Sequence, residues 1–311
     1  MWLFWFLLTI VLIKLFNKVT SGKCYDEKVM SGEVVVVTGA SGGIGYETAL
    51  EIAQRGAKVI IACRDAAKGQ RAVNEITKRT KNTKVRYMHL DLTSLASVRN
   101  FVEELKSSEA KLDVLVNNAG AICTKREYTA DGLLKDMQIN YFGPFLLTVL
   151  LVSLLKKSAP SRILVVSSAW HKFGTAEDIN DKRYCYIQSY ANSKFCNVVF
   201  SKELARRLAH TGVVVNSLNP GQVNTSLYKS SSFLERLRSL LLYFFFKTPN
   251  EGAQTSLYVA VSDYCDQVTG KYFEDCAEAS PSARTEDIVL AKKLWQLTEG
   301  LVKLTPEETS L

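Results

Sequence analysis

The chain has few of the residues from which metal centres and disulfide frameworks are built. Its 311 residues include only three histidines, His89, His171 and His210, and none has a second ligand at metal-like spacing. The seven cysteines are odd in number and contain no Cys-x-x-Cys pair, which argues against a disulfide framework and a zinc knuckle. We therefore expect no metal ion, hydrogen-bonded or solvent-facing histidines, and a reducing compartment.

Runs of like charge and flexible linkers are missing as well. Lys and Arg outnumber Asp and Glu by 39 to 31, but no run of five or six basic residues occurs. An excess spread in this way favours weak attraction to membranes or phosphate groups over nucleic-acid binding. No stretch rich in Pro, Gly or Ser and no internal repeat divides the chain, so we expect one domain over residues 30–303 and no nucleic-acid partner.

The first sixteen residues form an apolar stretch in which Lys14 is the only charged side chain. A full membrane crossing takes about 20 apolar residues, so the stretch is short for a transmembrane helix. Basic residues follow it instead of preceding it, unlike in a secretory signal peptide. We expect residues 1–22 to be an uncleaved membrane anchor or an interfacial helix, with the remaining chain on the cytoplasmic side.

From Gly32 onward, β-rich runs alternate with helical stretches. Continuous Val and Ile runs separated by helices indicate a parallel sheet covered on both faces, the doubly wound, Rossmann-type α/β architecture. The runs lie at residues 33–38, 58–62, 85–89, 112–116, 162–166 and 213–217, with a short strand expected near 269–273. Helices are expected from about Asn250 and from about Ala283.

Residues 228–247 interrupt this alternation. Apolar residues from Phe233 to Phe245 recur at helical spacing, while Arg236 and Arg238 take the other side. One interpretation is an ordinary helix packed on the core. The other is a lid over an apolar substrate, resting on the membrane.

The first strand ends in the sequence TGASGGIG, residues 38–45. Glycine at a strand-to-helix turn lets the backbone approach a pyrophosphate, and the helix N-terminus offers free N–H groups. The spacing is G-x-x-x-G-x-G, and the absence of G-K-[ST] excludes a Walker-type phosphate loop. The predicted cofactor contacts in this bend are Gly39, Ser41, Gly43, Ile44 and Gly45.

The tip of the second strand bears on the choice between NAD and NADP. An acidic residue there would accept from the ribose 2′-hydroxyl, whereas an arginine would pair with a 2′-phosphate. Cys63 occupies the tip and Arg64 follows it, which favours NADP(H). Asp65 leaves two interpretations open, because it could cap the next helix or act as an acidic ribose ligand.

Tyr190 and Lys194 lie four residues apart at the start of a long helical pattern. Residues at this spacing share a helical face, so the phenol and the ammonium can point into one site. An isolated tyrosine has a pKa of about 10, but a nearby cation favours the phenolate. The pair is therefore a candidate proton donor and acceptor near neutral pH.

The order of these motifs resembles the short-chain dehydrogenase/reductase family over about residues 34–280. Tyr190 and Lys194 match the family's catalytic pair, and residues 38–45 match its cofactor loop. The resemblance implies further roles for Asp91 and Leu92 near the adenine ring, Asn118 in the motif Asn-Asn-Ala-Gly, Asn140 at a water of the proton relay, Ser168 at the substrate, and Pro220 and Thr225 at the nicotinamide carboxamide.

The resemblance narrows to the microsomal retinol dehydrogenases that prefer NADP(H). It rests on ACRD at 62–65, DLTS at 91–94, KTP at 247–249 and GAQTS at 252–256, together with the apolar N-terminus. The segment between Ser168 and Tyr190 is longer than is usual in the family, as in that branch. It leaves open whether Ser167 or Ser168 faces the substrate, and we choose Ser168.

The resemblance implies an NADP(H)-dependent enzyme acting on CH–OH donors, and we expect it to reduce retinal to retinol. Another lipid aldehyde or a keto-steroid is the alternative substrate. A different class of function is a non-catalytic scaffold at a membrane or lipid droplet that retains the fold. We expect the enzyme at the endoplasmic reticulum or a lipid droplet, with the catalytic domain facing the cytoplasm, and leave its oligomeric state open.

Overall fold

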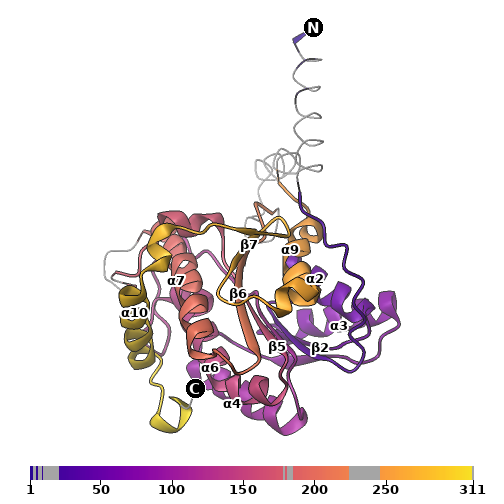
Figure 1. Cartoon of the computed structure of the whole chain (residues 1–311), viewed down its shortest axis with the longest axis horizontal. Helices are drawn as coiled ribbons and strands as arrows, with labels where there is room; N and C mark the ends of the chain where they lie inside the picture. The colour runs from indigo at the N-terminus through magenta and orange to yellow at the C-terminus, as the bar shows by residue number, and fades with distance from the viewer. Residues whose placement is uncertain are drawn as a thin grey trace.

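The computed structural model describes residues 1, 2, 5, 9, 21–177, 179–180, 185–223 and 246–309. Thr225 and nearly all of the insertion at 228–247 lie outside these residues. The described elements form one α/β domain around an eight-stranded sheet (Figure 1). The strands are β1 (Val34–Thr38), β2 (Lys58–Cys63), β3 (Val85–His89), β4 (Val114–Asn117), β5 (Ser161–Val166), β6 (Val213–Asn219), β7 (Tyr272–Glu274) and β8 (Ala277–Ala279).

The strand order is β3-β2-β1-β4-β5-β6-β7-β8. Neighbours pair in parallel from β3 through β7, which confirms the doubly wound architecture expected from the sequence. The edge strand β8 pairs antiparallel with β7 and was not expected. Its three residues are too short and too exposed to leave a hydrophobic signal.

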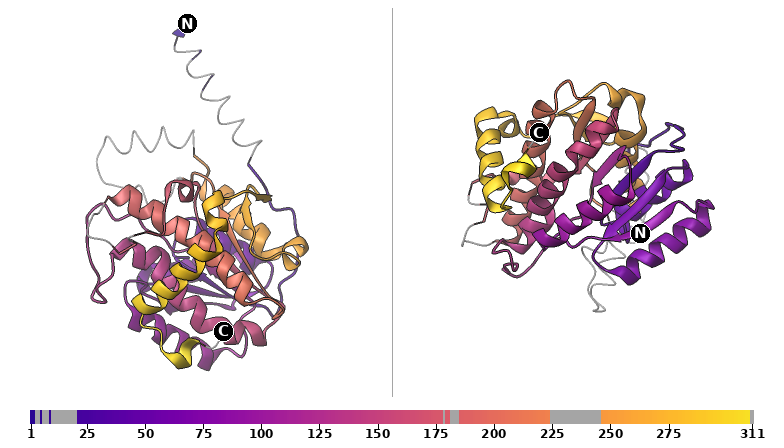
Figure 2. Two further views of the ribbon diagram at one scale, coloured as in Figure 1. Left: turned by 60° about the vertical axis from the view of Figure 1, so that its left-hand side comes forward. Right: turned by 90° about the horizontal axis from the view of Figure 1, so that it is seen from below.

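Helices cover both faces of the sheet (Figures 1 and 2). One face carries α2 (Gly43–Gln54), α3 (Ala66–Thr80) and α9 (Pro249–Val261); the other carries α4 (Leu95–Ser108), α6 (Gly143–Lys157), α7 (Tyr186–Arg207) and α10 (Ile288–Leu301). Successive side chains of a strand point to opposite faces. In β1, Val34 and Val36 therefore enter one core while Val35 and Val37 enter the other. Burial on both faces explains why this strand is a continuous valine run.

Two expected boundaries were wrong for local reasons. The last helix begins at Ile288, not near Ala283, because the Asp287 side chain accepts from the N–H groups of Val289 and Leu290. Residues 283–286 instead form the 3-10 turn η5 (Ala283–Glu286). The fourth strand begins at Val114, since the N–H of Leu112 donates to the Ser158 hydroxyl and not to a neighbouring strand.

The helical segment Lys135–Lys157 joins α5 (Lys135–Met137), the π-helical turn η1 (Gln138–Phe142) and α6. Among the helices of the described residues, this one is long enough and apolar enough to cross a membrane. However, 83% of its apolar window is buried in the domain, so it is a core helix. Membrane attachment through residues 1–22 stays a prediction.

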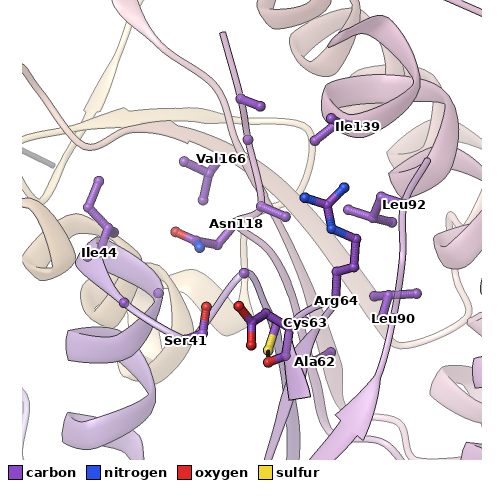
Figure 3. A pocket seen from close by; sticks show the side chains of 18 of the residues that line it. Ser41, Ile44, Ala62, Cys63, Arg64, Leu90, Leu92, Asn118, Ile139 and Val166 are labelled. Atoms are coloured by element: carbon purple, nitrogen blue, oxygen red, sulfur yellow. Dashed lines mark hydrogen bonds between the residues drawn. The ribbon is translucent and has the colours of Figure 1, made fainter. Parts of the chain in front are cut away.

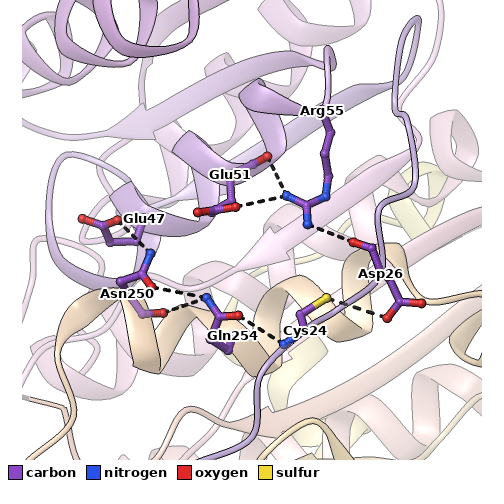
Figure 4. A network of polar contacts seen from close by, with 7 residues as sticks. All are labelled: Cys24, Asp26, Glu47, Glu51, Arg55, Asn250 and Gln254. Carbon is purple, nitrogen blue, oxygen red and sulfur yellow. Dashed lines mark hydrogen bonds and ion pairs between the residues drawn. The ribbon is translucent and has the colours of Figure 1, made fainter.

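The segment that follows the apolar N-terminus runs along α2 and α9 (Figure 4). The main-chain N–H of Cys24 donates to Oε1 of Gln254 on α9 at 3.1 Å. Arg55, which ends α2, donates from Nη2 to the carbonyl oxygen of Asp26 at 3.0 Å. These bonds tie the start of the domain to two helices on one face of the sheet.

The same segment meets the end of the insertion at Asp275, in the turn between β7 and β8. The N–H of Gly22 donates to Oδ1 of Asp275 at 3.3 Å, and Lys247 forms an ion pair with the same carboxylate. Lys247 also pairs with Val223 in a parallel bridge. The apolar N-terminus and the apolar insertion therefore join the domain at one place.

Candidate active site

A cavity of about 520 Å³ lies at the carboxyl ends of the parallel strands. Ligands of open α/β sheets bind at this end, where the strand order reverses. Every residue that the sequence predicted to contact a cofactor lines this cavity, from Gly39 to Pro220, apart from Thr225, which is outside the described residues. The structure thus brings together motifs that are far apart in the sequence.

At the glycine bend at the end of β1, neighbouring atoms lie too close to the backbone to leave room for a side chain. Gly39 has a φ of +68°, and a Cβ added to it would lie 2.9 Å from the Cα of Ala119. A Cβ on Gly45 would lie 2.4 Å from Nδ2 of Asn118. Asn118 in turn donates to the carbonyl oxygen of Thr38 at 2.8 Å. Glycine is therefore required for α2 to begin against the ends of β1 and β4.

The first turn of α2 has N–H groups with no side-chain cap. Its N-cap residue is Gly42, whereas the N-caps Asp65 of α3 and Ser94 of α4 accept a hydrogen bond from the following turn. A Cβ on Gly42 would meet no atom within 4 Å, so the bend is open on the cavity side. Uncapped N–H groups and the partial positive charge of a helix N-terminus suit a phosphate group.

The structure shows Asp65 in the first of its two predicted roles, as a helix cap. Its Oδ1 accepts from the N–H of Lys68 at 3.0 Å and its Oδ2 pairs with Lys68 Nζ at 3.1 Å, so it caps α3. The main-chain hydrogen bond from Lys68 is the main reason why the pKa of Asp65 is lowered. Asp65 is thus engaged as a helix cap.

Arg64 is exposed, and no ion pair to it occurs among the described residues. Its side chain extends across the cavity, with the guanidinium directed toward Leu92 and Ile139 (Figure 3). Lys68, one helical turn further on, lines the same end of the cavity. Sequence reasoning missed Lys68 and Ile139, although the spacing of four from Arg64 to Lys68 was a usable signal.

Asp91 and Leu92 line the cavity beside this cationic end. Oδ1 of Asp91 accepts from both the N–H and the hydroxyl of Thr93, at 2.9 and 2.7 Å. These two bonds hold the carboxylate at the carboxyl end of β3. Its position next to Leu92 places a hydrogen-bond acceptor beside an apolar wall.

Asn140 lies in the π-helical turn η1 and is buried. Its Oδ1 accepts from the N–H of Ala121 at 2.7 Å, and its Nδ2 donates to the carbonyl oxygen of Ala121 at 2.8 Å and to the Ser193 hydroxyl at 3.1 Å. The side chain therefore clamps the loop after β4 onto α7. A Cβ on Gly120 would lie 3.5 Å from both Asn140 Oδ1 and Lys194 Nζ, so Asn140 and Lys194 flank one point of that loop.

Tyr190 and Lys194 both line the cavity from the first turns of α7. Lys194 is only 3% exposed, its Nζ donates to the carbonyl oxygen of Val166 at 3.1 Å, and it lies 5.6 Å from the centre of the Tyr190 ring. Burial lowers the pKa of the Lys194 ammonium to about 8. The group remains mostly protonated at neutral pH and places a positive charge beside the phenol.

The two serines after β5 differ in what their hydroxyls do. Ser167 lines the cavity, but it is 2% exposed and its hydroxyl donates to the carbonyl oxygen of Lys194 at 2.8 Å. Ser168 is not among the residues that line the cavity; it is partly exposed, and its Oγ accepts from the N–H of Trp170 at 3.4 Å. Its hydroxyl proton has no acceptor within the described ranges, which favours Ser168 over Ser167 as a substrate contact.

The family model for short chain dehydrogenase matches residues 33–233, which include the glycine bend, the Tyr190 and Lys194 pair and the strands between them. The chain belongs to the short-chain dehydrogenase family. Its relatives in this family include retinol dehydrogenase 11 of Mus musculus, 41% identical over 96% of this chain and 95% of that protein. Retinol dehydrogenase 12 of Homo sapiens is 43% identical over 89% of this chain and 88% of that one.

Solved structures also superpose on this domain. An uncharacterized protein from Mycobacterium paratuberculosis has a TM-score of 0.72 and 31% identity, covering 91% of this chain and 98% of that one. The NADP active-site complex of RhlG from Pseudomonas aeruginosa has a TM-score of 0.63 and 25% identity, covering 79% and 95%. The family assignment makes this chain an oxidoreductase of the short-chain dehydrogenase type.

Proposed function

We propose that the chain is an NADP(H)-dependent oxidoreductase that interconverts a lipophilic alcohol and its carbonyl, with reduction of retinal to retinol as its main reaction. The observation that carries the proposal is the Tyr190 phenol beside the buried Lys194 ammonium, at a cavity that begins with the glycine bend. The names of its retinol dehydrogenase relatives support the choice of a retinoid.

The described residues fit a dinucleotide with a 2′-phosphate. The uncapped first turn of α2 would hold the pyrophosphate, and Arg64 with Lys68 would hold the 2′-phosphate. Asp91 and Leu92 would contact the adenine ring, and Pro220 and Thr225 the nicotinamide end. The NADP complex of the RhlG structure supports the same cofactor. When bound, the nicotinamide supplies or accepts hydride at the substrate carbon.

Side chains of the protein bind the carbonyl oxygen of the substrate and supply its proton. The hydroxyls of Ser168 and Tyr190 donate hydrogen bonds to the carbonyl oxygen, which gains negative charge as the carbon is reduced. Tyr190 gives its proton to this oxygen, and the Lys194 ammonium stabilises the resulting phenolate. Each pKa unit by which a cation acidifies the phenol corresponds to about 1.4 kcal/mol. We assign Asn140 to the relay that restores the proton.

An exposed apolar patch beside these groups supports a lipophilic substrate. The 3-10 turn η2 (Ala169–Phe173), directly after Ser168, exposes 42% of Trp170 and 69% of Phe173, whose ring centres lie 5.8 Å apart. The first turn of α7 exposes Tyr186 and Ile187, just before Tyr190. The two segments touch, since Gln188 Nε2 donates to the carbonyl oxygen of Phe173 at 3.0 Å. Large exposed apolar groups next to a reactive centre are typical of a binding surface.

We further propose that residues 1–22 hold the enzyme at the endoplasmic reticulum or at lipid droplets, with the domain in the cytoplasm. The basic residues after the apolar stretch support this orientation. The meeting of Gly22 and Lys247 at Asp275 would bring the apolar insertion to the same membrane. Another lipid aldehyde or a keto-steroid stays the alternative substrate.

The test is oxidation of NADPH with all-trans-retinal by the full chain. Tyr190→Phe removes only the phenolic hydroxyl group, and we expect it to lower the rate by about 100-fold or more. Tyr264→Phe is the matched control, because this exposed tyrosine bonds to Glu278 away from the cavity. An unchanged rate in Tyr190→Phe would refute the mechanism. A wild-type chain that binds neither nicotinamide cofactor would favour the non-catalytic scaffold.

A further inference from the structure

The turn η2, which directly follows Ser168, is built around a completely buried histidine. His171 is 0% exposed, and its Nδ1 lies 2.7 Å from the carbonyl oxygen of Ser168. The main-chain N–H of His171 donates to the same carbonyl oxygen at 3.0 Å. On the other side of the ring, Nε2 lies 3.0 Å from the main-chain nitrogen of Ser282.

These contacts determine the tautomer of the imidazole. A main-chain N–H can only donate, so Nε2 of His171 must accept the hydrogen bond from Ser282. The proton of the neutral ring therefore lies on Nδ1 and is donated to the carbonyl oxygen of Ser168. Burial lowers the pKa of His171, which keeps the ring neutral at physiological pH.

The partner of His171 belongs to the chain beyond β8, which packs over η2 from outside. Arg284 Nη2 donates to the carbonyl oxygens of Lys172 at 3.2 Å and Gly174 at 2.8 Å. The Thr285 hydroxyl donates to the carbonyl oxygen of Ser282 at 2.6 Å, which holds the 282–285 turn together. The Tyr272 ring packs against the imidazole with centres 4.9 Å apart, and its hydroxyl lies 3.5 Å from Nδ1.

We propose that His171 is a positioning residue for Ser168, and that the segment 282–284 holds His171 in the state that does so. The imidazole does not touch the substrate or transfer a proton. It fixes the main chain of Ser168, and thereby the direction of a hydroxyl that the proposed function assigns to the carbonyl oxygen. The inference rests on the proposed function, because its tests measure the rate of that reaction. A shift of about 1 Å in a reacting group can cost about 100-fold in rate, so a rigid serine main chain matters for turnover.

Two amide side chains separate the hydrogen bond of His171 to Ser168 from its hydrogen bond to Ser282. The amide of His171→Asn reaches the position of Nδ1 and keeps a donor to Ser168, whereas that of His171→Gln reaches the position of Nε2 and keeps only the bond with Ser282. With all-trans-retinal and NADPH, we expect kcat within about threefold of wild type for Asn and at least about tenfold lower for Gln. The KM for retinal and the affinity for NADPH should stay within about twofold in both.

A second pair of variants tests the hydrogen bond that the main-chain N–H of Ser282 donates to His171. Ser282 has a φ of −57°, which proline accepts, so Ser282→Pro removes the N–H donor without straining that angle. Ser282→Ala keeps the N–H and is its control. We expect the Pro variant alone to lower kcat, again with an unchanged affinity for NADPH.

The inference is overturned if the Asn and Gln variants lose kcat equally, or if Ser282→Pro behaves like Ser282→Ala. It is also overturned if His171→Gln lowers kcat as much in a Ser168→Ala background as in the wild type, because an effect exerted through Ser168 must vanish there. If Ser168→Ala by itself leaves kcat unchanged, the proposed role of Ser168 in the reaction fails instead.

Discussion

Substituting Arg64 by alanine tests which charge selects NADPH over NADH. Arg64 and Lys68 both line the adenosine end of the cavity. Lys68 Nζ lies 3.1 Å from Asp65 Oδ2, whereas Arg64 has no such carboxylate partner in the described part of the chain. A phosphate therefore competes with Asp65 for Lys68 but meets an uncompensated guanidinium at Arg64. The larger share of the selectivity should come from Arg64.

The magnitude follows from the exposure of the side chain. A hydrogen bond to a charged group contributes about 1.5–3 kcal/mol, and about 1.4 kcal/mol corresponds to a factor of ten in affinity. Arg64 is exposed, and solvent screening places its contribution at the lower end of that range. We expect Arg64→Ala to weaken NADPH binding about tenfold and Lys68→Ala about threefold or less.

The assay is a fluorescence titration of the full chain with NADPH and with NADH at two salt concentrations. NADH lacks the 2′-phosphate, so its affinity should be the same in the wild type and both variants. The loss for NADPH should shrink as salt is raised, because exposed charges are screened. Equal losses for NADPH and NADH in Arg64→Ala, or a larger loss in Lys68→Ala, would refute this assignment.

Three further predictions concern the reaction, the substrate and the fold. Lys194 keeps its proton below its pKa of about 8, so the rate of retinal reduction should fall as pH rises through that value; a flat profile to pH 9.5 would contradict this. Trp170→Ser should raise the KM for retinal several-fold but leave the KM for a short water-soluble aldehyde unchanged, as steady-state kinetics can show. Gly45→Ala places a Cβ 2.4 Å from Asn118 and should cost about 1–3 kcal/mol of folding free energy in urea titrations; Gly42→Ala, with open space around it, should cost less.

Much of the fold and of the site could be predicted from local patterns. The valine run of β1 has strand propensity and is buried on both faces, so its sequence alone indicates an interior strand. The bend after it requires glycine for backbone and packing reasons that act within a few residues. The spacing of four between Tyr190 and Lys194 places both side chains on one face of any helix. Because the carboxyl ends of parallel strands share one edge, these motifs also had to meet.

The remaining decisions depended on partners that are distant in the sequence. The capping of α3 by Asp65 could be seen only once the start of that helix was placed. The choice between Ser167 and Ser168 required the carbonyl oxygen of Lys194, which lies across the site. The imidazole of His171 has its tautomer set by a main-chain N–H 111 residues further on. A hydrogen bond is determined by distance and angle between two groups, and no spacing pattern encodes these when the two groups come from separate elements.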